Sequence, residues 1–383
     1  MNDQHTESSA PRGPGPLAWV GIALLFAATG ALSLAAAAMV AEPAATPAAR
    51  PATPPKRLAD TGLYADFATR TIAADVLPFT PQYPLWTDGA TKARWIRLPP
   101  GSAIDASDPD VWRFPIGTKL WKEFSFGARV ETRTMERGPD GAWVFAAYVW
   151  SADGSDAVLA DERGVRGVAT SAFGTRHDVP SVADCGACHA AGPNAVLGFS
   201  GLQLSADRDP LAPHREEPAP GAVFLDDLVE RGLVRGLPRS ITDTPPRIAA
   251  ATARERAALG YLHGNCGGCH TAQGALASLG LELDYPLAGA RRRAAPAIRS
   301  TLGRISRWQP LADASHPRVE PGVPDHSTLA RRIGSRSPVA AMPPLGTRAV
   351  DADAVALIRA WIESDLEHAA STNILSQLTE KSR

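Results

Sequence analysis

Two copies of one short motif constrain this chain more than any other feature. Each copy has two cysteines that are separated by two small residues and followed by a histidine: Cys185-Gly186-Ala187-Cys188-His189 and Cys266-Gly267-Gly268-Cys269-His270. The chain has four cysteines in all, so the two motifs use every one. We therefore expect no disulfide that staples the fold.

The spacing within each motif suits covalent attachment of haem. Two thiols add to vinyl groups on neighbouring pyrroles, and the imidazole that follows reaches the iron. The sequence thus predicts two haem c groups. Their thioether links would form at Cys185, Cys188, Cys266 and Cys269, and His189 and His270 would be axial ligands of the two irons.

Two other uses of paired cysteines fit the sequence less well. Zinc ribbons separate their pairs by about 15–20 residues, and the gap between Cys188 and Cys266 is far longer. A histidine after both pairs would be coincidental in such a site. A thioredoxin-like redox motif would need a βαβ pattern around it, and none is evident.

The N-terminal region carries an export signal. Residues 17–41 form a charge-free apolar stretch of about 25 residues, enough to span a bilayer, behind a short cytoplasmic tail, residues 1–16. It is interpreted as a membrane anchor or a signal peptide cut near Ala41. A Pro- and Ala-rich linker, residues 42–57, follows. We expect the remainder on the periplasmic side of a bacterial inner membrane, in contact with that membrane through the anchor.

Residues 58–176 are expected to form a small antiparallel sandwich or barrel. The candidate strands are short, rich in aromatic and β-branched residues, and separated by turn signals such as Pro139-Asp140-Gly141. They are Ala93–Leu98, Val111–Pro115, Lys119–Phe126, Arg129–Arg137 and Trp143–Trp150. The strand at 129–137 places Glu131 and Arg133 on one face.

The C-terminal region has a helical pattern. Thr252 and Glu255 form a capping box, and Asp351 opens a helix with an apolar face that includes Trp361. The whole chain is thus predicted to be α+β and multidomain: a membrane helix, the β domain, a first haem-binding segment (177–245), an all-α cytochrome c domain (246–369) and a tail (370–383).

A methionine is the expected second ligand of the second iron. Of the four methionines, Met1 starts the chain and Met39 lies in the export segment, which leaves Met135 and Met342. Pro343 and Pro344 stiffen the loop at Met342, and a thioether ligand raises the reduction potential of a haem. A buried filler is the alternative role for Met342.

The chain resembles two known groups of cytochromes. Residues 252–367 are similar to a class I cytochrome c domain, on the stretches Tyr261–His270, Pro321–Pro324, Met342–Pro344 and Ala356–Ile362. Residues 58–369 resemble bacterial dihaem cytochromes of poorly defined function, on Phe114–Lys119, Val130–Arg133 and Tyr148–Trp150. The first resemblance implies His270 as proximal and Met342 as distal ligand.

The sixth ligand of the first haem is left open by the sequence. The candidates are Met135, His177, His214 and His263, or no protein ligand at all. An iron without a sixth ligand would bind a small molecule, which is the property of an enzyme.

The sequence is consistent with three functions. The leading one is electron transfer with redox partner proteins. The others are a haem oxidoreductase, such as a dihaem peroxidase, and a docking subunit of a membrane dehydrogenase.

The charged residues give little further information on function. The basic run Arg291–Arg293 is either a steering site for an acidic partner or a solvated loop. A formal net charge of −1 argues against nucleic-acid binding.

Overall fold

The structure is a computed structural model that describes residues 53–288, 295–308 and 316–367. Contacts divide the chain into Met1–Ala49 and Arg50–Arg383, and the described residues all belong to the second unit. The predicted export segment, residues 17–41, and the basic run Arg291–Arg293 lie outside the described residues. Within the described ranges, no helix has the length and apolar character needed to cross a bilayer.

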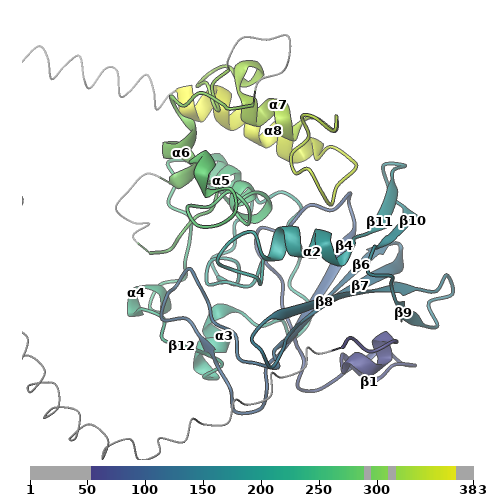
Figure 1. Ribbon diagram of the computed structural model, residues 1–383. Coiled ribbons are helices and arrows are strands. Elements are labelled where there is room, and N and C mark those ends of the chain that lie inside the picture. Colours follow the sequence, from purple (N-terminus) through teal and green to yellow (C-terminus); the bar gives the residue numbers. More distant parts are fainter. Residues whose placement is uncertain (1–52, 289–294, 309–315, 368–383) are drawn as a thin grey trace, which may run out of the picture. The chain divides into compact units, whose positions relative to one another are not determined.

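The largest element is an open antiparallel sheet of six strands (Figure 1). In spatial order these are β3 (Leu77–Pro78), β4 (Thr91–Arg97), β6 (Lys119–Phe126), β7 (Ala128–Arg137), β8 (Trp143–Trp150) and β9 (Ala157–Leu159). The predicted turn at Pro139-Asp140-Gly141 connects β7 to β8, and Gly141 supplies its positive φ of 80°.

Four of the five predicted strands are confirmed, as β4, β6, β7 and β8. The prediction at Val111–Pro115 is wrong, because only Arg113 pairs there, in an isolated bridge to Asp105. The prediction of a sandwich or barrel is also wrong, because the six strands form one open sheet with β3 and β9 at its edges.

Short elements complete the described chain. The two-stranded ladders are β1 (Tyr64–Asp66) with β2 (Thr71–Ile72), β10 (Val165–Thr170) with β11 (Arg176–Val179), and β5 (Ile104–Asp105) with β12 (Val234–Arg235). The helices are η2 (Leu58–Thr61), α2 (Val182–His189), α3 (Leu225–Glu230), α4 (Arg239–Thr242), α5 (Ala253–Asn265), η3 (Ala277–Leu279), α6 (Pro296–Thr301), η5 (Pro324–His326), α7 (Thr328–Ile333), α8 (Ala352–Ala360) and the π-helical turn η6 (Trp361–Asp365).

Both faces of the sheet are covered. On one face Trp121, Tyr148 and Trp150 pack against Leu58 and Leu63 from the segment before the sheet. On the other face a second cluster joins sheet residues to later segments: Ile96, Leu120, Met135, Phe199 and Leu228 are among its members. The aromatic residues of the β region thus fill cores, since burial of such rings is their largest contribution to stability.

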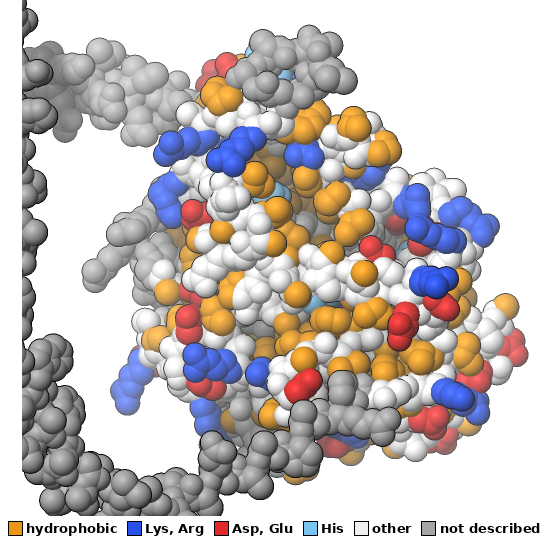
Figure 2. Space-filling view, in the orientation of Figure 1, with side chains coloured by type: hydrophobic (Ala, Val, Ile, Leu, Met, Phe, Trp, Pro, Cys, Tyr) orange, Lys and Arg blue, Asp and Glu red, His pale blue; other side chains and the backbone are white. Residues whose placement is uncertain are grey.

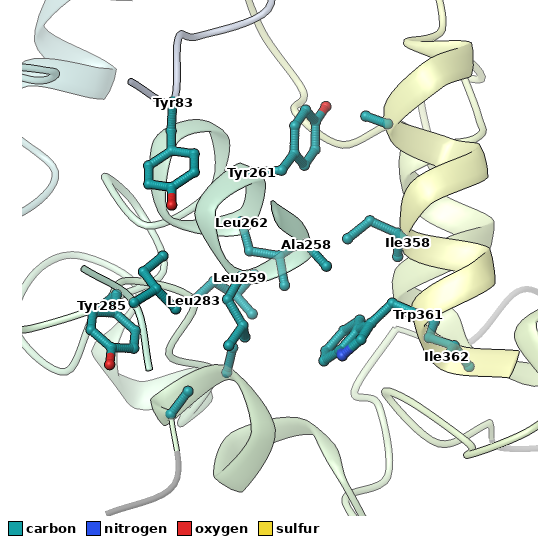
Figure 3. Packing of buried hydrophobic residues seen from close by; sticks show 14 of the residues in the cluster. Tyr83, Ala258, Leu259, Tyr261, Leu262, Leu283, Tyr285, Ile358, Trp361 and Ile362 are labelled. Carbon is teal, nitrogen blue, oxygen red and sulfur yellow. The ribbon is translucent and has the colours of Figure 1, made fainter. Parts of the chain in front are cut away.

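The two C-terminal helices begin at the predicted caps, with the side-chain half of the predicted capping box at Thr252. Thr252 caps α5 by accepting a hydrogen bond from the Glu255 N–H, and Asp351 caps α8 through the Ala354 N–H. Trp361 is fully buried and its indole lies between α8 and α5, as Figure 3 shows.

These helices do not form the all-α domain that the sequence predicts. Their core also contains Tyr83, Leu202 and Ala212, which belong to the β region and the first-motif segment. Residues between these helices form isolated β-bridges, such as the one between Leu302 and Val319. The predicted architecture with an all-α C-terminal domain is therefore wrong, because these helices share one core with residues of the β region and of the first-motif segment.

Candidate functional site

The first motif lies on helix α2. Ser181 and Asp184 form a reciprocal capping box that starts the helix, with both hydrogen bonds at 3.0 Å. The helix ends at His189. Helical spacing of three and four residues places Cys185, Cys188 and His189 on one face. Two thiols and an imidazole therefore point to the same side.

A hydrogen bond orients the imidazole ring of His189. Its Nδ1 donates to the carbonyl oxygen of Ala195 at 2.6 Å, which leaves the lone pair of Nε2 available. Histidines that bind metals are usually oriented in this way by a carbonyl partner on the other ring nitrogen. Burial lowers the pKa of His189 below its usual value, which favours the neutral ring.

The second motif forms the turn that ends helix α5. The Cys266 carbonyl accepts hydrogen bonds from Cys269 N–H at 3.1 Å and His270 N–H at 2.9 Å. The side chain of Asn265 fixes this turn, because its Oδ1 accepts from the Trp86 N–H at 2.7 Å. Nδ1 of His270 is buried and has no hydrogen-bond partner in the described part of the chain.

The fold brings the two motifs together. All four cysteines are free thiols, and those of Cys188 and Cys269 lie close enough to perturb each other: hydrogen bonding with Cys188 lowers the pKa of Cys269 to about 7. Around them, the Ala275 N–H donates to the Ala191 carbonyl at 2.9 Å. A Cβ on Gly192 would lie only 3.1 Å from the Gly268 carbonyl, so this approach requires small residues.

The donor set of the first motif fits a covalently held haem. Two free thiols with two residues between them and an imidazole with an available Nε2 are the groups that such a haem needs. The second motif has the same groups, with a less defined imidazole orientation. Among described residues, no three His, Cys, Asp or Glu side chains are grouped as ligands of one metal ion.

Met342 lies in a loop that is tied to helix α7. Its N–H donates to the Arg332 carbonyl at 3.1 Å, and Arg332 Nε donates to the Ala340 carbonyl at 2.9 Å. Burial is the main cause that lowers the pKa of His270, and the positive charge of Arg332 is the second. Arg332 thus connects the neighbourhoods of Met342 and His270.

Each histidine that is a candidate sixth ligand at the first motif has one ring nitrogen bonded to another group. Nε2 of His177 bonds to Glu131 at 2.8 Å, and Nε2 of His214 bonds to Asp351 at 2.7 Å. Nδ1 of His263 accepts from the Tyr285 N–H at 3.1 Å, which places the ring proton on Nε2. Met135 is buried in the core on the second face of the sheet.

A network of buried charges lies beside the first motif and was not predicted. Glu131 is fully buried and binds both His177 and Arg133. Burial alone would raise the pKa of Glu131, but these two partners hold it below its usual value. Arg133 interacts electrostatically with both Cys185 and Cys188. The one sequence signal was that Glu131 and Arg133 share a face of their strand.

Comparison of the chain with family models, with curated proteins and with solved structures finds no match.

Proposed function

We propose that this chain is an exported electron-transfer protein that carries two covalently attached haems. The observation that carries the proposal is the contact between the two motif segments, where the Ala275 N–H donates to the Ala191 carbonyl at 2.9 Å and a Cβ on Gly192 would lie 3.1 Å from the Gly268 carbonyl; Cys188 and Cys269 also perturb each other's pKa. Each of these cysteines belongs to a different attachment motif. Groups bound through neighbouring sulfur atoms have adjacent edges, and electron tunnelling falls steeply with distance. The arrangement supports passage of electrons between the two sites.

The residues have distinct roles in this function. The cysteines anchor the groups, His189 and His270 ligate the irons, and Met342 is the proposed second ligand beside His270. A thioether ligand raises the reduction potential relative to an imidazole ligand, so the second site would be the stronger electron acceptor. Residues 17–41 would direct export, which places the sites among redox partners in the periplasm.

An optical redox titration of the purified full-length protein tests this function. We expect two one-electron steps at different potentials, with the more positive step lost in Met342→Ala. A single step that accounts for all haem absorbance, or a protein that accepts no electrons, would contradict the proposal.

A haem oxidoreductase is the second candidate. The observation that favours it is that ring nitrogens of His177, His214 and His263 are committed to other partners. The first iron would then have an open position. Carbon monoxide distinguishes the two functions: binding to one ferrous haem at neutral pH supports the enzyme, and no binding supports the carrier.

A further inference from the structure

The turn between β10 and β11 presents an aromatic side chain to solvent. The Ser171 N–H donates to the Thr175 carbonyl at 2.8 Å, and the Gly174 N–H donates to the Ser171 carbonyl at 3.0 Å. These hydrogen bonds fix the turn, and Phe173 at its tip is 54% exposed. Aromatic side chains are enriched at the centres of protein–protein interfaces, so the ring of Phe173 is a candidate contact for another protein.

Three arginines line an open pocket beside this turn. The pocket has a volume of about 610 Å³, and its lining includes Thr175 of the turn, Arg166 of β10, Arg176 of β11 and Arg348 of the loop before α8. Figure 2 shows Lys and Arg side chains gathered on the side of the molecule where Figure 1 labels β10 and β11. A basic surface therefore lies beside the exposed ring.

The charges of this pocket do not cancel. Arg166 Nη1 lies 2.9 Å from Asp178 Oδ2, and Arg348 binds the same carboxylate. Arg176 donates to the carbonyl oxygen of Gly167. Among the residues that line the pocket, three guanidinium groups face one carboxylate, which leaves a surplus of two positive charges. The side chain of Arg166 is 84% exposed, so its charge is accessible to a partner.

The exposed ring is connected to the second motif. The centroid of the Phe173 ring lies 5.6 Å from that of the buried Trp86 indole, and a Cβ on Gly89 would lie only 3.0 Å from the Phe173 ring. The Trp86 N–H donates to Asn265 Oδ1 at 2.7 Å, and Asn265 is the residue before Cys266. One ring contact and one hydrogen bond thus separate the surface from the motif.

The same segment holds Arg348 in place. Carboxylate oxygens of Asp88 accept the N–H of Arg348 at 2.9 Å and the N–H of Ala349 at 2.8 Å. Trp86 Nε1 donates to the Ala349 carbonyl at 3.5 Å. The basic pocket, the exposed ring and the connection to the second motif are therefore parts of one packed arrangement.

We propose that Phe173 and the three arginines form the docking site of an acidic electron-carrier protein. The inference rests on the proposed function, because it assumes a haem at the second motif. Carboxylates of the partner pair with the surplus positive charge, and an apolar contact covers Phe173. A small anion would use the arginines alone and leave this ring in solvent. One electron passes from the reduced partner to ferric iron at the second motif, which becomes ferrous, and no bond is broken and no proton is transferred.

Binding of a plant-type ferredoxin, an acidic one-electron carrier, to the full-length holoprotein tests the docking site. Calorimetric titration at low salt compares the wild type with a double variant, Arg166→Gln with Arg176→Gln. We expect a Kd about tenfold or more higher in the double variant and a weaker dependence of Kd on salt, because charges at an interface steer association. Arg113→Gln is the matched control, since Arg113 is an exposed arginine whose ion pair with Asp105 lies outside this surface. It should leave the Kd unchanged.

Electron transfer gives a second readout. Reduced ferredoxin is mixed with ferric holoprotein in a stopped-flow instrument, and the limiting rate at high ferredoxin concentration is measured. Phe173→Leu keeps an apolar side chain but removes the ring that contacts Trp86. We expect a lower limiting rate in this variant, with a smaller change in Kd. An unchanged limiting rate would overturn the connection through Phe173.

The contrary results for docking are distinct. Equal Kd values for the double variant and the wild type, with both haems attached, would overturn the site, as would a wild type that shows no salt-dependent binding. Preference of the wild type for anionic phospholipid vesicles, lost in the double variant, would also overturn it, because the surface would then face a membrane. A wild type that binds ferredoxin but carries no haem would instead show that the proposed function has failed, although the acidic-protein site stands.

A double variant that does not accumulate is replaced by Arg166→Glu. The side chain of Arg166 is largely exposed, so this reversal of charge should leave the fold intact, and Arg113→Glu is its control. A higher Kd in Arg166→Glu than in this control supports the docking site, and equal values overturn it.

Discussion

The thiols of Cys188 and Cys269 are neighbours, although they belong to motifs far apart in the sequence. Helix α2 and the turn after α5 bring them together. Chromophores attached at these positions would interact, and we predict a split circular-dichroism couplet in the Soret region of the holoprotein. Cys188→Ala, which leaves Cys185 and His189 in place, should weaken the couplet. A wild type with two haems and two independent, unsplit bands would contradict this geometry.

Met342→Ala should abolish thioether ligation at one haem. The backbone of Met342 is held against α7 by Arg332, which places the loop but leaves the assignment to be tested. The measurement is the weak ferric absorption band in the far red that marks an iron–thioether bond. Met135→Leu is the matched control, because Met135 is a core residue and its loss should leave the band intact. A band that persists in Met342→Ala would exclude this ligand.

Glu131→Gln should destabilise the protein strongly. Glu131 is fully buried and is the counter-ion of Arg133, and removal of one partner from a buried ion pair costs about 3–5 kcal/mol. Glu136→Gln on the same strand breaks a partly exposed pair with Lys119, which should cost less than about 1 kcal/mol. Denaturant unfolding of both variants gives the comparison, and equal losses would contradict the role of Glu131.

Trp361→Ala should cost about 3–5 kcal/mol, the usual loss for a large ring in a core. The indole is fully buried among residues of α5 and of the β region, so the loss should be felt by the whole described unit in one unfolding transition. Val339→Ala, at a site that is 78% exposed, should change stability by less than about 0.5 kcal/mol. A separate early transition of the C-terminal helices in Trp361→Ala would show that they do fold independently.

Asp178 should make stability depend on pH below 4. Burial alone would raise its pKa, but the Gly167 N–H and the guanidinium groups of Arg348 and Arg166 lower the pKa of Asp178 to about 2. A carboxylate with a depressed folded-state pKa stabilises the fold above its unfolded value of about 3.9 and loses that effect as pH falls toward about 2.

We therefore expect Asp178→Asn to be about 1–2 kcal/mol less stable than the wild type at pH 7, since the exposed arginines are screened. The difference should shrink between pH 4 and pH 2 in thermal melts. A difference that stays constant across this range would contradict the assignment of the effect to the carboxylate.

The sequence predicted local structure better than it predicted assembly. Strands such as Lys119–Phe126 and Trp143–Trp150 were correct because their aromatic side chains suit the half-buried face of a sheet. The all-α domain was wrong because the core of α5 and α8 takes in Tyr83 and Leu202, which no local pattern connects to them.

In the candidate site, too, local features could be predicted and tertiary contacts could not. The motifs and the haem attachment proposed for them come from spacing alone, and the N-caps at Ser181 and Thr252 begin the helices that carry them. The proximity of Cys188 to Cys269 depends on tertiary packing.

Covalent haem on both cysteine pairs is the central claim, and its most direct measurement is a reduced pyridine haemochrome spectrum combined with the intact mass of the mature protein from its native host. We predict two haems per chain that remain bound after denaturation and acid extraction, and no free thiols. A colourless denatured protein with four titratable thiols, or one that holds zinc in place of iron, would contradict the account.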